Sequence, residues 1–150
     1  MSLGAYFMGP VVDQREHCRL TPNREATSAD LAKIGVETEK IDMTADWESQ
    51  LDKLAATFDM HSRDEIHISR ETMPDFDKKD DWIRIPVQCG DFLFLPAGIY
   101  HRFTTDKNDD ITAVRLFRSS PRWEALPRSS ETESLEERKE FVELVKKRTE

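Results

Sequence analysis

Residues 90–103, "GDFLFLPAGIYHRF", say more about the fold than any other stretch of the chain. Phe92 to Leu95 is a short, wholly apolar run, "PAG" is typical of a tight turn, and residues 99–103 alternate between apolar and polar side chains. An alternation of period two predicts a β-strand, in which His101 shares a face with its apolar neighbours at 99 and 103. The stretch therefore predicts two short strands with His101 on their interior side.

The flanking sequence extends this pattern to a small antiparallel sheet. Ile83–Val87 alternates, "CGD" makes a turn, and Ile111–Phe117 follows the turn "DKNDD" as another strand. A further short strand is expected at Tyr6–Met8. Strands this short, joined by tight turns, are typical of part of a small β-barrel or sandwich.

Helical spacing of apolar residues and capping residues predict three helices, near residues 28–34, 45–58 and 135–148. Thr44 is a candidate N-cap for the second helix, and Ser134 with Glu137 has the pattern of a capping box for the third. The predicted fold is mostly β with flanking helices (α+β), in a single domain over residues 1–150.

Composition narrows the classes of function. The 150 residues are 35% charged and carry a formal net charge of −8, which nucleic acid or an anionic membrane surface would repel. No apolar run approaches the roughly 20 residues of a membrane helix, and no signal-peptide pattern occurs. Cys18 and Cys89 are too few for a secreted disulfide framework. We expect no nucleic-acid partner, no membrane insertion and a cytoplasmic location, with a nuclear pool left open.

The spacing around His101 resembles the second metal-binding motif of the cupin superfamily. Gly90, Pro96, Gly98 and His101 follow one another with five, one and two residues between them. "DWIRI", "GDFLFLPAGIYHRFT" and "AVRLF" narrow the resemblance to acireductone dioxygenases, and "DQREH", "LAKIGV", "KID" and "RDEIHIS" are similar to that family's N-terminal half. The resemblance covers most of residues 5–118 and implies a small, cupin-like antiparallel β-barrel.

The resemblance also implies a chemistry. Acireductone dioxygenases of the methionine salvage pathway hold Fe²⁺ or Ni²⁺ with three histidines and one glutamate, and the metal-bound acireductone reacts with O₂. The iron form yields formate and the keto-acid precursor of methionine, whereas the nickel form yields an off-pathway product and carbon monoxide. His101 matches the last histidine ligand, and the other three ligands belong to a His-x-His followed, after four residues, by Glu.

No His-x-His occurs in the chain. Compared with the family, a segment on the order of thirty residues, enough for a short helix and a hairpin, is expected to be missing between residues 77 and 80. His101 would then be the sole surviving metal-ligand position, and no catalytic residue would be competent. We expect no tightly bound iron or nickel and an incomplete barrel. A splice form, a gene model lacking an exon and a paralogue with a deletion all stay open.

Other side chains could rebuild the site. The remaining histidines and nearby carboxylates are His17, His61, His67, Asp64, Glu65 and Glu71. However, "EIHIS" reads as extended chain, where positions four apart lie about 13 Å apart, and the resemblance puts it outside the metal site. The sequence is thus interpreted as an inactive family member. The alternatives are an active metal-dependent dioxygenase with a rebuilt site, or a non-catalytic module that binds a protein partner through an exposed barrel edge.

Overall fold

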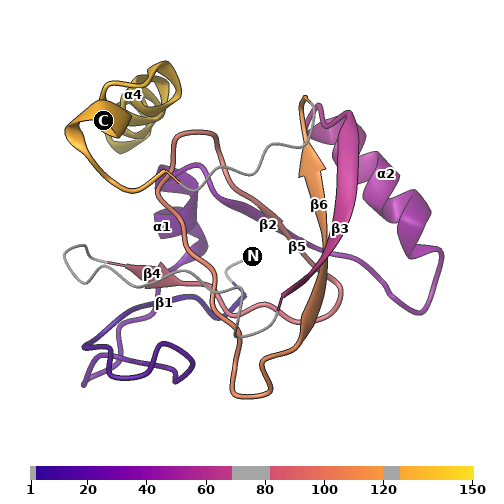
Figure 1. Cartoon of the computed structure of the whole chain (residues 1–150), viewed down its shortest axis with the longest axis horizontal. Coiled ribbons are helices and arrows are strands. Elements are labelled where there is room, and N and C mark those ends of the chain that lie inside the picture. The colour runs from indigo at the N-terminus through magenta and orange to yellow at the C-terminus, as the bar shows by residue number, and fades with distance from the viewer. Residues whose placement is uncertain (1–2, 69–81, 120–125) are drawn as a thin grey trace.

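A computed structural model describes residues 3–68, 82–119 and 126–150, and the structural statements below refer to these residues. The fold is an α+β mixture of short strands and helices (Figure 1). In chain order the elements are β1 (Tyr6–Phe7), α1 (Ser28–Lys33), β2 (Glu37–Lys40), α2 (Trp47–Thr57), β3 (Ser62–Ile68), β4 (Ile83–Arg84), β5 (Asp91–Phe94), β6 (Ile111–Phe117), α3 (Ser130–Glu133) and α4 (Glu136–Thr149).

The strands pair between the two halves of the chain rather than with their neighbours in sequence. β1 pairs with β4, β2 with β5 and β3 with β6, always antiparallel. The longest ladder runs from Ser62 opposite Phe117 to Ile68 opposite Ile111. Within the described residues these are three two-stranded sheets that do not close into a barrel. The antiparallel, α+β character is confirmed, and the cupin fold is compatible with this pairing.

The core lies where α1 meets the first two strand pairs. Ala5, Ala26, Leu31 and Val36 form its buried centre, and apolar side chains from β4, β5 and their flanks pack against it. A second apolar cluster joins α2 to β5. There the ring of Phe58 stacks on Phe94 with centroids 4.6 Å apart. Burial of these apolar surfaces holds the helices against the strands.

The three predicted helices are present, but two of their predicted caps are wrong. Thr44 does not cap α2, because Asp46 accepts the hydrogen bond from the Ser49 amide at 3.1 Å. Ser134 does not cap α4, which begins after Leu135 without a side-chain cap. Ser134 instead lies at the end of the short helix α3, which the sequence analysis did not predict, and its hydroxyl donates to the Glu131 carbonyl at 2.6 Å.

Of the four strands predicted in the C-terminal half, two are confirmed, one is much shorter than predicted and one is absent. β6 coincides with the prediction and β5 nearly so, while the strand expected at Ile83–Val87 is reduced to β4. Residues 99–103 form no strand, and His101 is exposed rather than inward-facing. The neighbouring Gly98 carbonyl and Tyr100 hydroxyl bond instead to residues of the C-terminal helices.

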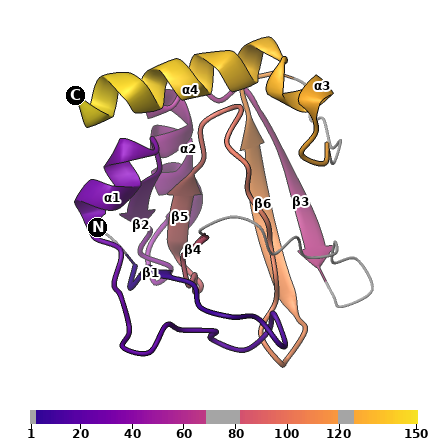
Figure 2. The ribbon, with the colours of Figure 1, turned by 90° about the vertical axis from the view of Figure 1, so that its left-hand side faces the viewer.

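α4 crosses one end of the strands in Figure 2, so the C-terminal helix covers that end of the molecule. Arg148 near its C-terminus donates to the Ala32 carbonyl of α1 at 2.7 Å. No helix among the described residues has the length and apolar character needed to cross a membrane.

Candidate functional site

His101 follows a turn that contains glycine in a left-handed conformation, Gly98 with φ of +82°. The Nδ1 atom of His101 lies 3.2 Å from the Ile99 carbonyl oxygen. Because a carbonyl oxygen can only accept, this contact requires the proton on Nδ1. The neutral ring then presents Nε2 as the nitrogen with a lone pair, which is the form of histidine that binds metals.

The other candidate side chains lie on and beside β3. As expected, "EIHIS" is extended, and Arg63, Glu65 and His67 share an exposed face of the strand. His61 precedes the strand, and its amide donates to the Phe117 carbonyl at 2.8 Å, which continues the ladder with β6. The Nε2 atom of His61 lies 2.8 Å from Oδ1 of Asp59, with both side chains largely exposed.

Asp64 faces the opposite side of β3 and is occupied by an ion pair. The Arg115 guanidinium on β6 donates to both of its carboxylate oxygens, with Nε 2.9 Å from Oδ1. The hydrogen bonds from Arg115 lower the pKa of Asp64, outweighing the partial burial that opposes them. Asp64 therefore joins β3 to β6 and does not share a face with His61 and Glu65.

The remaining candidates are dispersed. His67 lies 3.5 Å from Asp110 through Nε2. His17 accepts a hydrogen bond from the Tyr6 hydroxyl at 2.5 Å through its backbone carbonyl, so it helps to hold the N-terminal segment. Glu71 and residues 77–80 fall outside the described residues.

The arrangement does not assemble a metal site. Among residues 3–68, 82–119 and 126–150, no three His, Cys, Asp or Glu side chains lie close enough together to hold a metal ion. The closest pairing of a candidate histidine with a carboxylate is that of His61 with Asp59. As arranged, these residues do not fit the three-histidine, one-glutamate metal centre that the sequence resemblance implies.

Comparison with known proteins places the chain in a family. The model of the ARD/ARD' family matches residues 77–125. The acireductone dioxygenase of Phaeosphaeria nodorum is 35% identical, over 81% of this chain and 85% of the relative. An identity at this level, over most of both chains, shows common descent. The chain belongs to the acireductone dioxygenase family.

Two further relatives are more similar over shorter lengths. The acireductone dioxygenases of Saccharomyces cerevisiae and Puccinia graminis f. sp. tritici are 40% and 47% identical over 65% and 59% of this chain. The matches span 59% and 51% of those relatives, so this chain covers little more than half of their length.

The lengths of these alignments bear on the segment that is expected to be missing between residues 77 and 80. The Saccharomyces alignment has 106 positions for about 98 residues of this chain, so about eight positions lack a residue here. The Puccinia alignment has 92 positions for about 88 residues, which leaves about four. Continuous runs of these lengths within 150 residues include residues 77–80 wherever they begin. These two alignments therefore leave no room for a gap of about thirty residues between residues 77 and 80.

A gap of about that size does occur in the alignment with the Phaeosphaeria relative. The Phaeosphaeria alignment has 153 positions for about 122 residues of this chain, which leaves about thirty positions unmatched. Since the other two alignments run through the neighbourhood of residue 77 without such a gap, nothing in the three comparisons requires these thirty positions to fall between residues 77 and 80. The residues just before position 77 then have counterparts in the relatives.

This result directs attention to a motif that the sequence analysis missed. Asp59-Met60-His61, with Glu65 four residues further on, has the spacing of the family's His-x-His and Glu, with aspartate in place of the first histidine. A pattern that requires histidine at both ends does not match it. A carboxylate is also a metal ligand, and allowing one at the first position would have found the motif.

Proposed function

We propose that this chain is an acireductone dioxygenase family member whose metal site is altered at one ligand and which is inactive towards acireductone. The observation that carries the proposal is Asp59, at the position where the family spacing has its first histidine. On this assignment His61, Glu65 and His101 keep the other three ligand positions. His101 is then one of three retained positions rather than the sole one.

The pairing of β3 with β6 supports the assignment of the ligand strand. The ladder sets Glu65 opposite Val114, in the strand "AVRLF" that the family resemblance includes. His61 lies at the start of the same ladder through its amide bond to Phe117. The strand that carries the candidate ligands is therefore present and paired with the C-terminal half.

Two features of Asp59 oppose tight binding of iron or nickel. Imidazole suits Fe²⁺ and Ni²⁺, whereas carboxylate oxygens suit harder ions such as Mg²⁺ and Mn²⁺, so the replacement weakens the site for the family's metals. Its Oδ1 also lies 2.8 Å from Nε2 of His61 and so occupies that imidazole. A dioxygenase of this kind needs a metal with open positions for substrate and O₂, so weak metal binding should abolish turnover.

One observation favours the active alternative enough to be tested beside it. His61, His101 and Glu65 are two histidines and one carboxylate, the ligand set of many non-haem iron oxygenases. If a metal drew these three together, the chain could act on acireductone with Asp59 as an additional carboxylate. The two candidate functions therefore differ in a measurable quantity, the turnover of the unmodified chain.

The test is an acireductone assay on the purified full chain, supplied with Fe²⁺ or Ni²⁺ before substrate and O₂. We expect no product above background from the unmodified chain and measurable product from Asp59→His, which completes the family motif. Asp59 has φ of +58°, and histidine is among the residue types that tolerate this conformation. Turnover by the unmodified chain would establish the active alternative instead.

A matched control comes from the same strand. His67 is an exposed histidine near a carboxylate, Asp110, but lies outside the family spacing. His67→Gln in the Asp59→His background should leave the recovered activity unchanged, whereas His101→Ala should remove it.

Two expectations from the sequence stay predictions. They are a cytoplasmic location, with a nuclear pool left open, and a protein partner that binds at an exposed barrel edge.

A further inference from the structure

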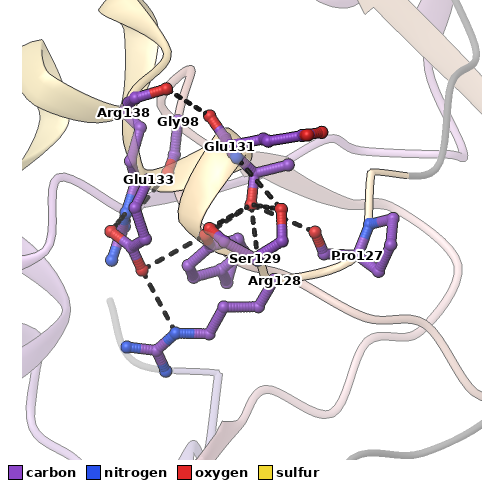
Figure 3. A network of polar contacts seen from close by, with 10 residues as sticks. Gly98, Pro127, Arg128, Ser129, Glu131, Glu133 and Arg138 are labelled. Carbon is purple, nitrogen blue, oxygen red and sulfur yellow. Dashed lines mark hydrogen bonds and ion pairs between the residues drawn. The ribbon is translucent and has the colours of Figure 1, made fainter.

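The C-terminal helices hold a polar cluster that the proposed function does not use. We call residues 128–149, with α3 and α4, the C-terminal clasp, because they fasten onto the turn before His101 (Figure 3). The family model ends at residue 125, so the clasp lies wholly outside the part of the chain that it matches.

The first contact between the clasp and the turn is at Gly98. A β-carbon added at this glycine would lie 2.1 Å from the Glu137 carbonyl oxygen, well inside any real contact distance. The backbone at the start of α4 therefore packs directly on the turn, and only glycine leaves room for it. The position of the turn depends on that of the helix.

Arg138 makes the second attachment. Its side chain is only 15% exposed. Nη1 donates to the Gly98 carbonyl at 3.1 Å, and the guanidinium lies 4.3 Å from the centre of the Tyr100 ring. Nε donates to Oε2 of Glu133 at 3.1 Å, so one side chain joins the turn, the tyrosine and α3.

Tyr100 makes the third attachment, through its hydroxyl. The hydroxyl donates to Oε1 of Glu133 at 3.2 Å and lies 3.2 Å from the Thr132 hydroxyl. Arg128 donates to the same Glu133 oxygen at 3.1 Å. The hydrogen bond from Arg138, with smaller contributions from Tyr100 and Arg128, keeps the pKa of Glu133 low, so this carboxylate stays ionised near neutral pH.

These attachments bracket the backbone that orients His101. The contact from Nδ1 goes to the Ile99 carbonyl, and Ile99 lies between the two residues that the clasp holds, Gly98 and Tyr100. We propose that Arg138 is a positioning residue for His101: by fixing the turn it keeps the Ile99 carbonyl on Nδ1 and so presents Nε2 to a ligand. The inference rests on the proposed function only in treating His101 as a ligand position.

The tautomer of His101 reports this role without any metal. In the full chain with ¹⁵N-labelled histidine, at a pH where imidazoles are neutral, long-range ¹H–¹⁵N spectra give both ring-nitrogen shifts of each of the four histidines. We expect the Nδ1-protonated form for His101. In Arg138→Ala its two nitrogen shifts should move towards each other as the tautomers mix, while those of His67 stay in place. Arg138→Lys should rescue them only partly, because lysine lacks the guanidinium fork.

Two further variants keep the test decisive. Arg148→Ala removes another arginine of α4, one that bonds to Ala32 rather than to the turn, and should leave His101 unchanged. Tyr100→Phe keeps the ring but removes the hydroxyl, and should shift His101 in the same direction even if Arg138→Ala does not fold. Unchanged His101 shifts in the folded Arg138→Ala or in Tyr100→Phe, or an equal shift in Arg148→Ala, would overturn the proposal. The histidine spectra of these variants are independent of whether Asp59→His recovers activity, so the two proposals can fail separately.

Discussion

Single residues with left-handed backbone show how similar geometry serves different purposes. Gly98 and Gly4 have φ of +82° and +72°, but a β-carbon would meet the α4 backbone at the first and nothing within 4 Å at the second. Both positions favour glycine because of the positive φ. Of the two, only Gly98 also lacks space for a β-carbon. Asp59, with φ of +58°, shows that a polar residue can also occupy this region, and there its side chain reaches His61.

The two glycines give a matched pair of substitutions. Gly98→Ala combines backbone strain with overpacking and should lower the free energy of unfolding by about 2–5 kcal/mol. Gly4→Ala should lower it by only about 1–2 kcal/mol, from backbone strain alone. Urea unfolding of both variants measures the difference, and equal losses would mean that α4 does not pack on the turn.

Helices and strands are set by local signals at their ends and by partners far along the chain. Thr27 caps α1 in a capping box with Asp30. The similar pattern at Ser134 fails because the chain has already turned into α3 there. A capping motif thus predicts a helix start only where no other helix competes for the same residues.

The caps predict unequal effects on stability. Thr27→Ala removes a used cap and should lower the free energy of unfolding by about 1 kcal/mol. Ser134→Ala removes a hydroxyl that does not cap α4 and should change it by no more than about 0.5 kcal/mol. Thermal unfolding of the two variants compares them directly, and a larger loss at Ser134 would restore the predicted capping box.

The ion pair between β3 and β6 predicts a dependence on pH. Arg115 lowers the folded-state pKa of Asp64 below its unfolded value of about 3.9, so the pair stabilises the fold above that pH and loses this contribution as the pH falls through the folded-state pKa. Asp64→Asn should flatten the acid limb of the curve of melting temperature against pH. Asp52→Asn, which breaks the exposed pair with Arg63, should leave the curve nearly unchanged. An unaltered acid limb in Asp64→Asn would contradict the expected coupling.

For the molecule as a whole, the sequence predicts what is local and misses what is distant. The three predicted helices and β6 follow from patterns within a dozen or so residues. The pairing of β1, β2 and β3 with strands of the other half joins residues 43 to 78 positions apart, and no local pattern encodes a partner. Residues 99–103 alternate like a strand, yet Tyr100 and the preceding Gly98 bond to the C-terminal clasp instead.

The residues of the candidate site also differ in how well the sequence predicts them. The turn motif of His101 is continuous in sequence and predicts a ligand position. Asp59 is not predicted because its residue type departs from the family's pattern, and without it His61 and Glu65 are only two of several scattered candidates. Two alignments run past residue 77 without a long gap, and the β3–β6 ladder shows that the strand with Glu65 is present, which supports the proposed ligand positions. The proposed inactivity follows from one substituted ligand rather than from a missing segment.

Metal titration of the unmodified chain beside Asp59→His tests that claim most directly. Isothermal titration with Ni²⁺, and with Fe²⁺ under anaerobic conditions, gives the affinity and the stoichiometry. The account predicts weak binding to the unmodified chain and near-stoichiometric binding to Asp59→His, tighter by at least about tenfold, because ligand substitutions should exceed the 10–100-fold effects of residues that only support a ligand. Near-stoichiometric binding to the unmodified chain, or no gain in Asp59→His, would contradict it.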